Sequence, residues 1–210
     1  MKIAVVGTGN VGGTLGKGWA KKGHDVTFGV RNTSDPKLKE RLATTGGKVR
    51  VGSVKDAAAS AEVVALTVPW DAAQDAVKNA GDLHGKIVLD CTNPLKPDLS
   101  GLTHGYDTSG AEQIAKWAAG ARVVKIFNTT GFGNMANPVY PEGPSMMLYS
   151  GDDAAAKTVA AQLATDLGFA AYDLGPLSEA RLLEPLALIW IKLAVQQKMG
   201  INFAFRLVRR

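Results

Sequence analysis

Short apolar runs alternate with helix-like segments along most of the chain. The predicted strands of the first part are 3–6, 26–30, 48–51, 62–68, 86–90 and 122–127. The predicted helices are 13–22, 36–43, 54–60, 71–79 and 110–119. Such alternation is typical of a parallel sheet with helices on both faces. We therefore predict an α/β protein with a Rossmann-type, doubly wound, mainly parallel sheet.

The last third of the chain has a different pattern. A segment rich in Gly and Pro over 131–144 predicts a loop near the active site, and the elements after it are a strand at 145–150, a helix at 153–167, a strand at 170–174 and a long helix at 178–199. We expect a small C-terminal α/β extension that ends in this helix. Residues 1–128 would form a dinucleotide-binding domain, and residues 129–210 would cover the substrate and mediate dimerisation.

The long C-terminal helix is apolar over much of its circumference, and Pro185 inside it is a potential kink. A helix of this kind is buried in its own core or against a partner chain. We expect a homodimer through the 178–199 helix. The charged residues Lys192 and Lys198 exclude a membrane span at this position.

A glycine motif joins the first strand to the first helix. It reads Gly7-Thr8-Gly9-Asn10-Val11-Gly12, a G-x-G-x-x-G pattern in the strand–turn–helix context of a dinucleotide site. Gly7 permits the tight turn, Gly9 lets the backbone approach a pyrophosphate, and Gly12 allows close packing of the helix. The helix N-terminus then offers free N–H groups to the phosphates. The motif predicts a dinucleotide cofactor.

The end of the second strand indicates which dinucleotide binds. A site for NAD places Asp or Glu there to accept hydrogen bonds from the ribose 2′-hydroxyl. This chain has Arg31, Asn32 and Thr33 instead. A guanidinium binds a 2′-phosphate through charge-assisted hydrogen bonds, and the neutral side chains add donors. We therefore predict NADP(H).

Composition excludes several other classes of function. The chain has 210 residues, a dispersed net charge of +5, one cysteine and three histidines far apart in sequence. These numbers predict neither a nucleic-acid surface nor a disulfide framework nor a metal site. Met1 leads directly into the first strand, without a signal peptide or a membrane-spanning run, so a cytoplasmic location is expected.

Three strand ends carry residues suited to a site, because ligands of open α/β sheets lie at the carboxyl ends of the strands. Thr67, Val68, Pro69 and Trp70 follow one strand, Asn93 and Pro94 another, and Phe127, Asn128 and Thr129 a third. Trp70 either stacks on a ligand or fills the core. Asn93 and Asn128 either bind an amide or carbonyl group or cap their loops.

General acid–base residues are few. The candidate proton donors are His104, in the loop or lid predicted over 93–105, and Lys125, within a strand. Asn128 is a further catalytic candidate, and Cys91 is best explained as a buried filler. An alcohol or ketone dehydrogenase usually needs a donor such as His, Lys or Tyr. The scarcity favours hydride transfer between two bound rings, in which proximity determines the rate.

The chain resembles the NADP oxidoreductases that depend on 8-hydroxy-5-deazaflavin. The resemblance rests on the glycine motif, on Gly29 to Arg31, on Leu66 to Trp70 and on the segment Gly175 to Glu184 that opens the long helix. The reductase domain of the six-transmembrane metalloreductases looks similar, with a flavin as the second ring.

The resemblance implies that NADPH lies along the glycine turn, with its 2′-phosphate near Arg31 and Asn32, and that a deazaflavin or flavin stacks on the nicotinamide. Thr67, Val68, Pro69, Asn93 and Pro94 would line the cofactor. The pocket of the ring acceptor would include Trp70, Phe127, Asn128, Thr129 and Met135.

The residues after the fifth and sixth strands depart from the family pattern, which reads an apolar-Pro-Val stretch and a His-Thr pair there. This departure leaves the acceptor open. The alternatives are direct reduction of a small carbonyl, imine or quinone, with His104 as a possible acid, or a non-catalytic module that senses NADP(H).

Overall fold

The computed structural model describes residues 1–36, 38 and 49–210. The helix predicted over 36–43 therefore lies largely outside the described residues. The strand predicted over 48–51 is observed as β3 (Val49–Ser53), and its first predicted residue is not among those described. The other predicted strands and helices are all present, with small shifts at their ends.

The sheet of the described residues has eight strands in the order β10-β9-β6-β5-β4-β1-β2-β3. The further bounds are β1 (Lys2–Val6), β2 (Asp25–Val30), β4 (Val63–Leu66), β5 (Ile87–Asp90), β6 (Arg122–Lys125), β9 (Met146–Gly151) and β10 (Ala170–Asp173). Strands β1 to β6 are parallel, β9 is antiparallel to β6, and β10 is parallel to β9. The predicted doubly wound, mainly parallel sheet is confirmed, and it continues without a break into the C-terminal part.

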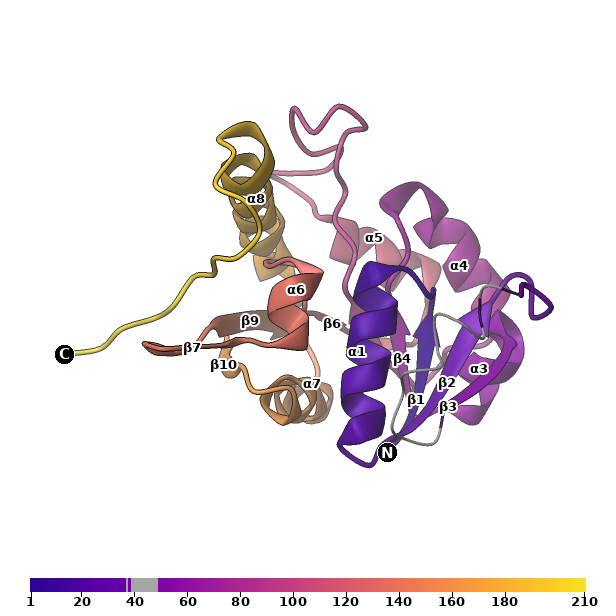
Figure 1. The fold of residues 1–210 in the computed structure, drawn as a ribbon. Helices are drawn as coiled ribbons and strands as arrows, with labels where there is room; N and C mark the ends of the chain where they lie inside the picture. Colours follow the sequence, from indigo (N-terminus) through magenta and orange to yellow (C-terminus); the bar gives the residue numbers. More distant parts are fainter. Residues whose placement is uncertain (37, 39–48) are drawn as a thin grey trace.

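Helices cover both faces of the sheet (Figure 1). Their bounds are α1 (Asn10–Lys21), α3 (Val54–Ser60), α4 (Ala73–Ala80), α5 (Gly110–Trp117), α7 (Ala154–Asp166) and α8 (Ala180–Ile191). One core cluster joins the sheet to α1 and α7, and a second joins it to α3, α4 and α5. Both cores contain Val, Ile, Leu and Ala side chains from the apolar runs of the sequence, and the first adds large side chains such as Trp19, Phe28 and Met147.

The loop expected over 131–144 contains regular structure, which corrects the prediction. It forms the helix α6 (Phe132–Ala136) and the two-stranded hairpin β7 (Val139–Tyr140) and β8 (Gly143–Pro144). The buried Asn134 side chain stabilises this segment: its Nδ2 donates to Phe203 O at 2.7 Å, and its Oδ1 accepts from Tyr140 Oη at 2.6 Å. These contacts come partly from the C-terminal tail, so glycine and proline content alone could not reveal them.

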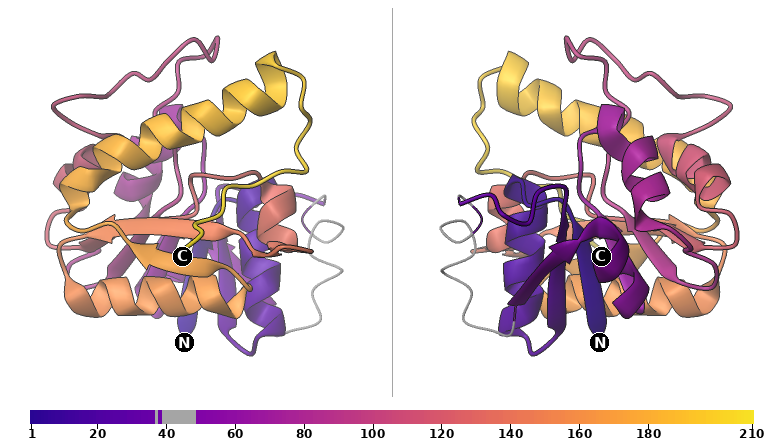
Figure 2. Two further views of the ribbon diagram at one scale, coloured as in Figure 1. Left: turned by 90° about the vertical axis from the view of Figure 1, so that its left-hand side faces the viewer. Right: turned by 90° about the vertical axis from the view of Figure 1, so that its right-hand side faces the viewer.

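The long C-terminal helix is confirmed but is built from three pieces. A 3₁₀ turn (Leu177–Glu179) leads into α8, and a π-helical stretch (Lys192–Gln196) ends it. The helix continues through Pro185. It crosses above β9 while α7 lies on the other side of that strand (Figure 2). The helix therefore covers the C-terminal part of the sheet.

Only one face of α8 is buried. It carries Ala180, Leu183, Glu184, Ala187 and Trp190. The apolar side chains of Leu182 and Ile189 are more than half exposed. Within the described residues, no helix is long and apolar enough to cross a membrane.

Candidate nucleotide-binding site

The turn between β1 and α1 depends on two of its glycines. Gly7 has a φ of +106°, a conformation that side chains disfavour. A Cβ atom at Gly12 would lie 2.3 Å from both Gly7 O and Thr67 Oγ1. The Thr67 hydroxyl donates to Val6 O at 2.8 Å and lies 3.3 Å from Gly7 O. Thr67 thus fixes the turn, a role that the sequence did not indicate.

The N-terminus of α1 suits an anionic group. Gly9 is the N-cap residue, no side chain of the described residues caps the helix, and its first turn contains no acidic residue. A Cβ at Gly9 would meet no atom within 4 Å. Backbone N–H groups at the start of a helix carry partial positive charge and need acceptors. The residues present therefore fit a pyrophosphate.

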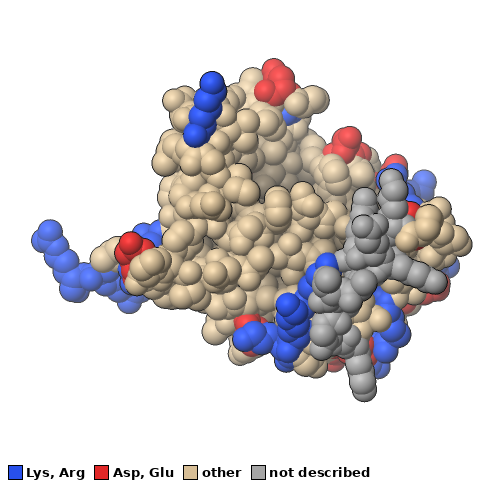
Figure 3. Space-filling view, viewed as in Figure 1, with Lys and Arg blue, Asp and Glu red and all other residues tan. Residues whose placement is uncertain are grey.

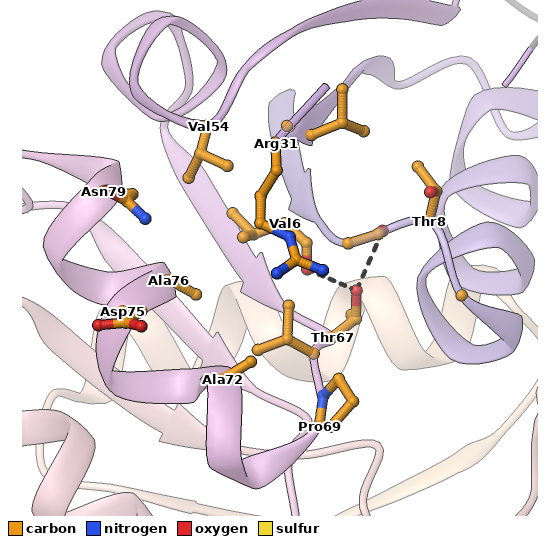
Figure 4. A pocket seen from close by; sticks show the side chains of 15 residues that line it. Val6, Thr8, Arg31, Val54, Thr67, Pro69, Ala72, Asp75, Ala76 and Asn79 are labelled. Atoms are coloured by element: carbon orange, nitrogen blue, oxygen red, sulfur yellow. Dashed lines mark hydrogen bonds between the residues drawn. The ribbon is translucent and has the colours of Figure 1, made fainter. Parts of the chain in front are cut away.

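A cavity of about 340 Å³ opens beside this turn (Figure 4). The predicted site residues that line it are Gly7, Thr8, Gly9, Arg31, Thr67, Val68 and Pro69. The residues of its wall that sequence reasoning missed are Val6, Gly29, Val30, Val54, Ala72, Asp75, Ala76 and Asn79. The predicted residues Asn10, Val11, Gly12, Asn32, Thr33, Asn93 and Pro94 are not part of its lining.

Arg31 extends from the end of β2 into this cavity (Figure 4). Among the residues that the structure describes, no carboxylate pairs with its guanidinium. Asn32 instead forms a local turn, because its Oδ1 accepts from Ser34 N at 3.0 Å. Arg31 is thus a cation that lines the cavity and is available to an anionic ligand.

Asn93 and Asn128 lie together where β5 and β6 end, as their positions predict. Asn93 Nδ2 donates to Asn128 O at 3.0 Å, and Asn128 Nδ2 donates to Asn93 Oδ1 at 3.1 Å. Asn128 Nδ2 also donates to Leu183 O of α8 at 3.0 Å. Both amide NH₂ groups therefore bond within the protein, as in the loop-capping alternative, whereas the buried Oδ1 of Asn128 has no hydrogen-bond partner among the described residues.

The other residues expected around the acceptor are mostly buried or packed against neighbouring side chains. Phe127 and Met135 are 1% and 2% exposed and belong to the hydrophobic core. Thr129 is buried. Trp70 packs between Trp117, with ring centroids 5.5 Å apart, and His104, at 5.2 Å. Of the two alternatives for Trp70, the structure favours packing, and His104 lies against this aromatic pair.

Lys125 is sealed inside the protein and cannot serve as a proton donor to a ligand. Its Nζ lies 2.8 Å from Asp90 Oδ2, 2.9 Å from Glu184 Oε1 and 2.6 Å from Thr92 O. Burial by itself lowers the pKa of Lys125, but the two carboxylates outweigh it, so the pKa is raised.

Cys91 is buried as expected, and burial, followed by the charge of Asp90, raises the pKa of its thiol.

Glu184 links α8 to β6 and α5. Besides Lys125, its carboxylate accepts from Gly110 N at 2.9 Å and Ala111 N at 3.1 Å, the first N–H groups of α5. One turn earlier, Arg181 forms a bidentate pair with Glu112, with distances of 2.7 and 3.0 Å. The segment that opens the long helix is thus a docking segment, and the buried charge in it has a structural explanation.

A hollow lies between α8 and the part of the molecule that contains α1 (Figure 3). The surface visible inside it carries neither basic nor acidic side chains, whereas charged residues lie around the outside of the molecule. The hollow is therefore suited to an uncharged group.

Comparisons with known proteins agree with this arrangement. The family model described as "NADP oxidoreductase coenzyme F420-dependent" matches residues 2–94. The F420-dependent NADP reductase of Methanothermobacter thermautotrophicus is 30% identical, with 95% of this chain and 91% of that protein covered. The solved structure of a presumed F420-dependent NADP reductase from Arthrobacter sp. FB24 is 35% identical over the whole of both chains, with a TM-score of 0.89.

A further relative is the metalloreductase STEAP3 of Rattus norvegicus, which is 29% identical. The match covers 89% of this chain but only 36% of that protein. The full-length matches agree with the resemblance that the motifs indicated and with NADP(H) as the cofactor. The chain belongs to the F420-dependent NADP reductase family and is an NADP-dependent oxidoreductase.

Proposed function

We propose that the protein transfers a hydride between NADP(H) and a deazaflavin or flavin-like ring acceptor. The hollow beneath α8 carries the proposal for the acceptor, because its visible surface lacks charge and it adjoins the nucleotide-binding half. The relatives named as F420-dependent NADP reductases support the deazaflavin.

For the cofactor, we propose that the pyrophosphate binds at Gly9 and the N-terminus of α1 and that Arg31 binds the 2′-phosphate. The uncapped helix and the unpaired guanidinium among the described residues support this arrangement. Thr67 holds the turn in shape, and Asn93 and Asn128 hold the loops at the rim.

The residues at the rim support ring-to-ring transfer. NADP(H) supplies or accepts the hydride with its two electrons when it is bound. Lys125 is fully buried and cannot give a proton to a ligand. The ring of His104 packs against Trp70, and we propose that it is not a proton donor either. The chain's contribution is then to bind two rings next to each other, which is how proximity accelerates such a transfer. The proton that accompanies reduction of the acceptor comes from solvent.

The direct test mixes purified protein and NADPH with the 8-hydroxy-5-deazaflavin coenzyme and follows the absorbance of the deazaflavin. Rapid loss of its colour, dependent on NADPH, is the expected result. Binding of NADPH without any change in the deazaflavin would contradict the proposal. Parallel reactions with flavins, quinones, imines and small carbonyls would then identify the class of acceptor, and an absence of turnover with all of them would favour an NADP(H)-sensing role.

We further propose that residues 1–128 bind NADP(H) and that residues 129–210 cover the acceptor and form a homodimer. The exposed apolar side chains of Leu182, Ile189 and Val195 on the C-terminal helix support the dimer. Light scattering after size-exclusion chromatography should give a mass of two chains for the wild type. The variant Ile189→Lys should give the mass of a single chain. Val139→Lys, on the β7–β8 hairpin, is the matched control. A monomeric wild type would contradict this proposal.

A cytoplasmic location stays a prediction.

A further inference from the structure

The α4 wall of the cavity carries two polar side chains to which the proposed binding of NADP(H) gives no role. Ala72, Asp75, Ala76 and Asn79 all line the cavity. Their spacing of three and four residues places them on one face of the helix. Neither Asp75 nor Asn79 has a hydrogen-bond or ion-pair partner among the residues that the structure describes. Both side chains are exposed, so a ligand in the cavity can replace the water around them.

The order of groups across the cavity indicates which part of the ligand meets α4. In Figure 4, Thr8 lies on one side, the α4 residues lie on the other, and the guanidinium of Arg31 lies between them. NADP(H) has the same order of groups: the pyrophosphate, then the ribose with its 2′-phosphate, then adenine. With the pyrophosphate at the glycine turn and the 2′-phosphate at Arg31, adenine reaches the α4 wall.

The chemistry of this wall suits a flat purine. Ala72 and Ala76 are small, and Val54 and Val68 add methyl groups, so the faces of a ring find apolar contacts. Asp75 is different, because an ionised carboxylate accepts hydrogen bonds and donates none. Asp75 is exposed at the edge of the cavity, and a ligand group that replaces the water around its carboxylate must donate a hydrogen bond to match that water. The 6-amino group is the hydrogen-bond donor on the edge of adenine.

We propose that Asp75 accepts a hydrogen bond from the 6-amino group of adenine and thereby selects adenine over bases that lack this donor. Asn79, one turn further along α4, offers an amide that both donates and accepts, and it faces the same base. The inference rests on the orientation of NADP(H) proposed above. It makes Asp75 a specificity-determining residue of the cofactor site.

The test compares NADP⁺ with nicotinamide 1,N6-ethenoadenine dinucleotide phosphate, whose 6-nitrogen is closed into a ring and has no hydrogen to donate. Dissociation constants are measured by calorimetry for the wild type, Asp75→Leu and Asp71→Leu. Leucine removes the acceptor while roughly keeping the volume. Asp71 is an exposed acidic residue in the turn before α4 that does not line the cavity. Both ligands carry the same phosphates, so the loss of a negative charge changes both affinities equally and cancels in their ratio.

We expect the wild type and Asp71→Leu to prefer NADP⁺ by about tenfold, as for a hydrogen bond to a charged group. Asp75→Leu should reduce this preference to about twofold or less. An unchanged ratio in Asp75→Leu would overturn the inference. The same samples titrated with NAD⁺ distinguish this failure from the failure of the underlying orientation. Equal wild-type affinities for NAD⁺ and NADP⁺ would contradict the role of Arg31, and with it the placement of adenine.

Discussion

The glycine turn and the α8 docking segment serve the same molecule in opposite ways. The turn is largely local, since β1, Gly7 to Gly12 and α1 follow one another in sequence, and it depends on the absence of side chains at Gly7 and Gly12, with one distant side chain, Thr67, bonded to it. The docking segment depends on side chains from distant parts of the chain, because Glu184 contacts Lys125 and the start of α5. The first arrangement can be recognised from a motif, whereas the second becomes visible only in three dimensions.

The largest effect is expected from a substitution that breaks the contacts of the docking segment, residues 175–184, which opens the long helix. Glu184→Ala leaves Lys125 with one carboxylate fewer and removes the acceptor of two N–H groups of α5. Loss of one partner from a buried ionic cluster costs about 3–5 kcal/mol. We expect a decrease of this size in the free energy of unfolding, measured by urea denaturation.

Glu142→Ala is the control for this change, because Glu142 is exposed in the β7–β8 hairpin. It should leave the unfolding free energy unchanged within about 0.5 kcal/mol. Equal effects of the two substitutions would show that the buried cluster does not hold α8 in place.

Glu184 also shows where sequence reasoning ends. The pattern around it predicts an apolar helix, and the helix is present. A carboxylate inside such a helix has no local signal for its partners, since Lys125 and the N–H groups of α5 lie 59 and about 74 residues earlier in the chain. Likewise, the motif placed Arg31 at the cavity, but the α4 wall was missed. The spacing of residues 72, 75, 76 and 79 was a usable signal, because small and polar residues recur there on one helical face.

The next effect concerns binding rather than folding. Arg31→Ala removes the unpaired guanidinium from the cavity. We expect NADPH to bind more weakly by about 1.5–3 kcal/mol, the range for a hydrogen bond to a charged group. NADH, which lacks the 2′-phosphate, should lose little affinity, and fluorescence titration with both nucleotides measures the difference.

Arg50→Ala removes the same charge from a surface ion pair with Asp25 and serves as the control. Its affinity for NADPH should match that of the wild type. If Arg31→Ala weakened NADH as much as NADPH, the arginine would act on a part of the nucleotide other than the 2′-phosphate.

A smaller effect is expected from a substitution that distorts the glycine turn. Gly12→Ala places a methyl group 2.3 Å from Gly7 O and Thr67 Oγ1. Overpacking of this kind costs about 1–3 kcal/mol of stability, and the displaced turn should also weaken NADPH binding. Gly13→Ala is a matched control, because its Cβ would meet only Thr8 O, at 3.8 Å. Thermal denaturation and NADPH titration of both variants should separate them, and equal behaviour would exclude close packing as the reason for Gly12.

The smallest effect is expected at the ion pair between Arg181 of α8 and Glu112 of α5, and it depends on pH. Arg181 lowers the pKa of Glu112 below its ordinary value of 4.5, chiefly through their hydrogen bonds. A carboxyl whose pKa is lower in the folded state contributes stability above the unfolded pKa and loses it as the pH falls through the folded pKa. Arg181→Ala should therefore lower the denaturation midpoint slightly at pH 7, and the difference from the wild type should shrink below about pH 4.5.

Lys116→Ala, an exposed lysine on the same helix as Glu112, removes the same charge without breaking this pair. Its difference from the wild type should stay nearly constant between pH 7 and pH 4. If the effect of Arg181→Ala also persisted at low pH, the aliphatic part of the arginine side chain would be responsible, through packing against α5. The contact between Arg181 and Glu112 would then stabilise the position of α8 through packing rather than through charge. Of the contacts made by Glu112 and Glu184, that of Glu184 would be the one that holds α8 by its charge.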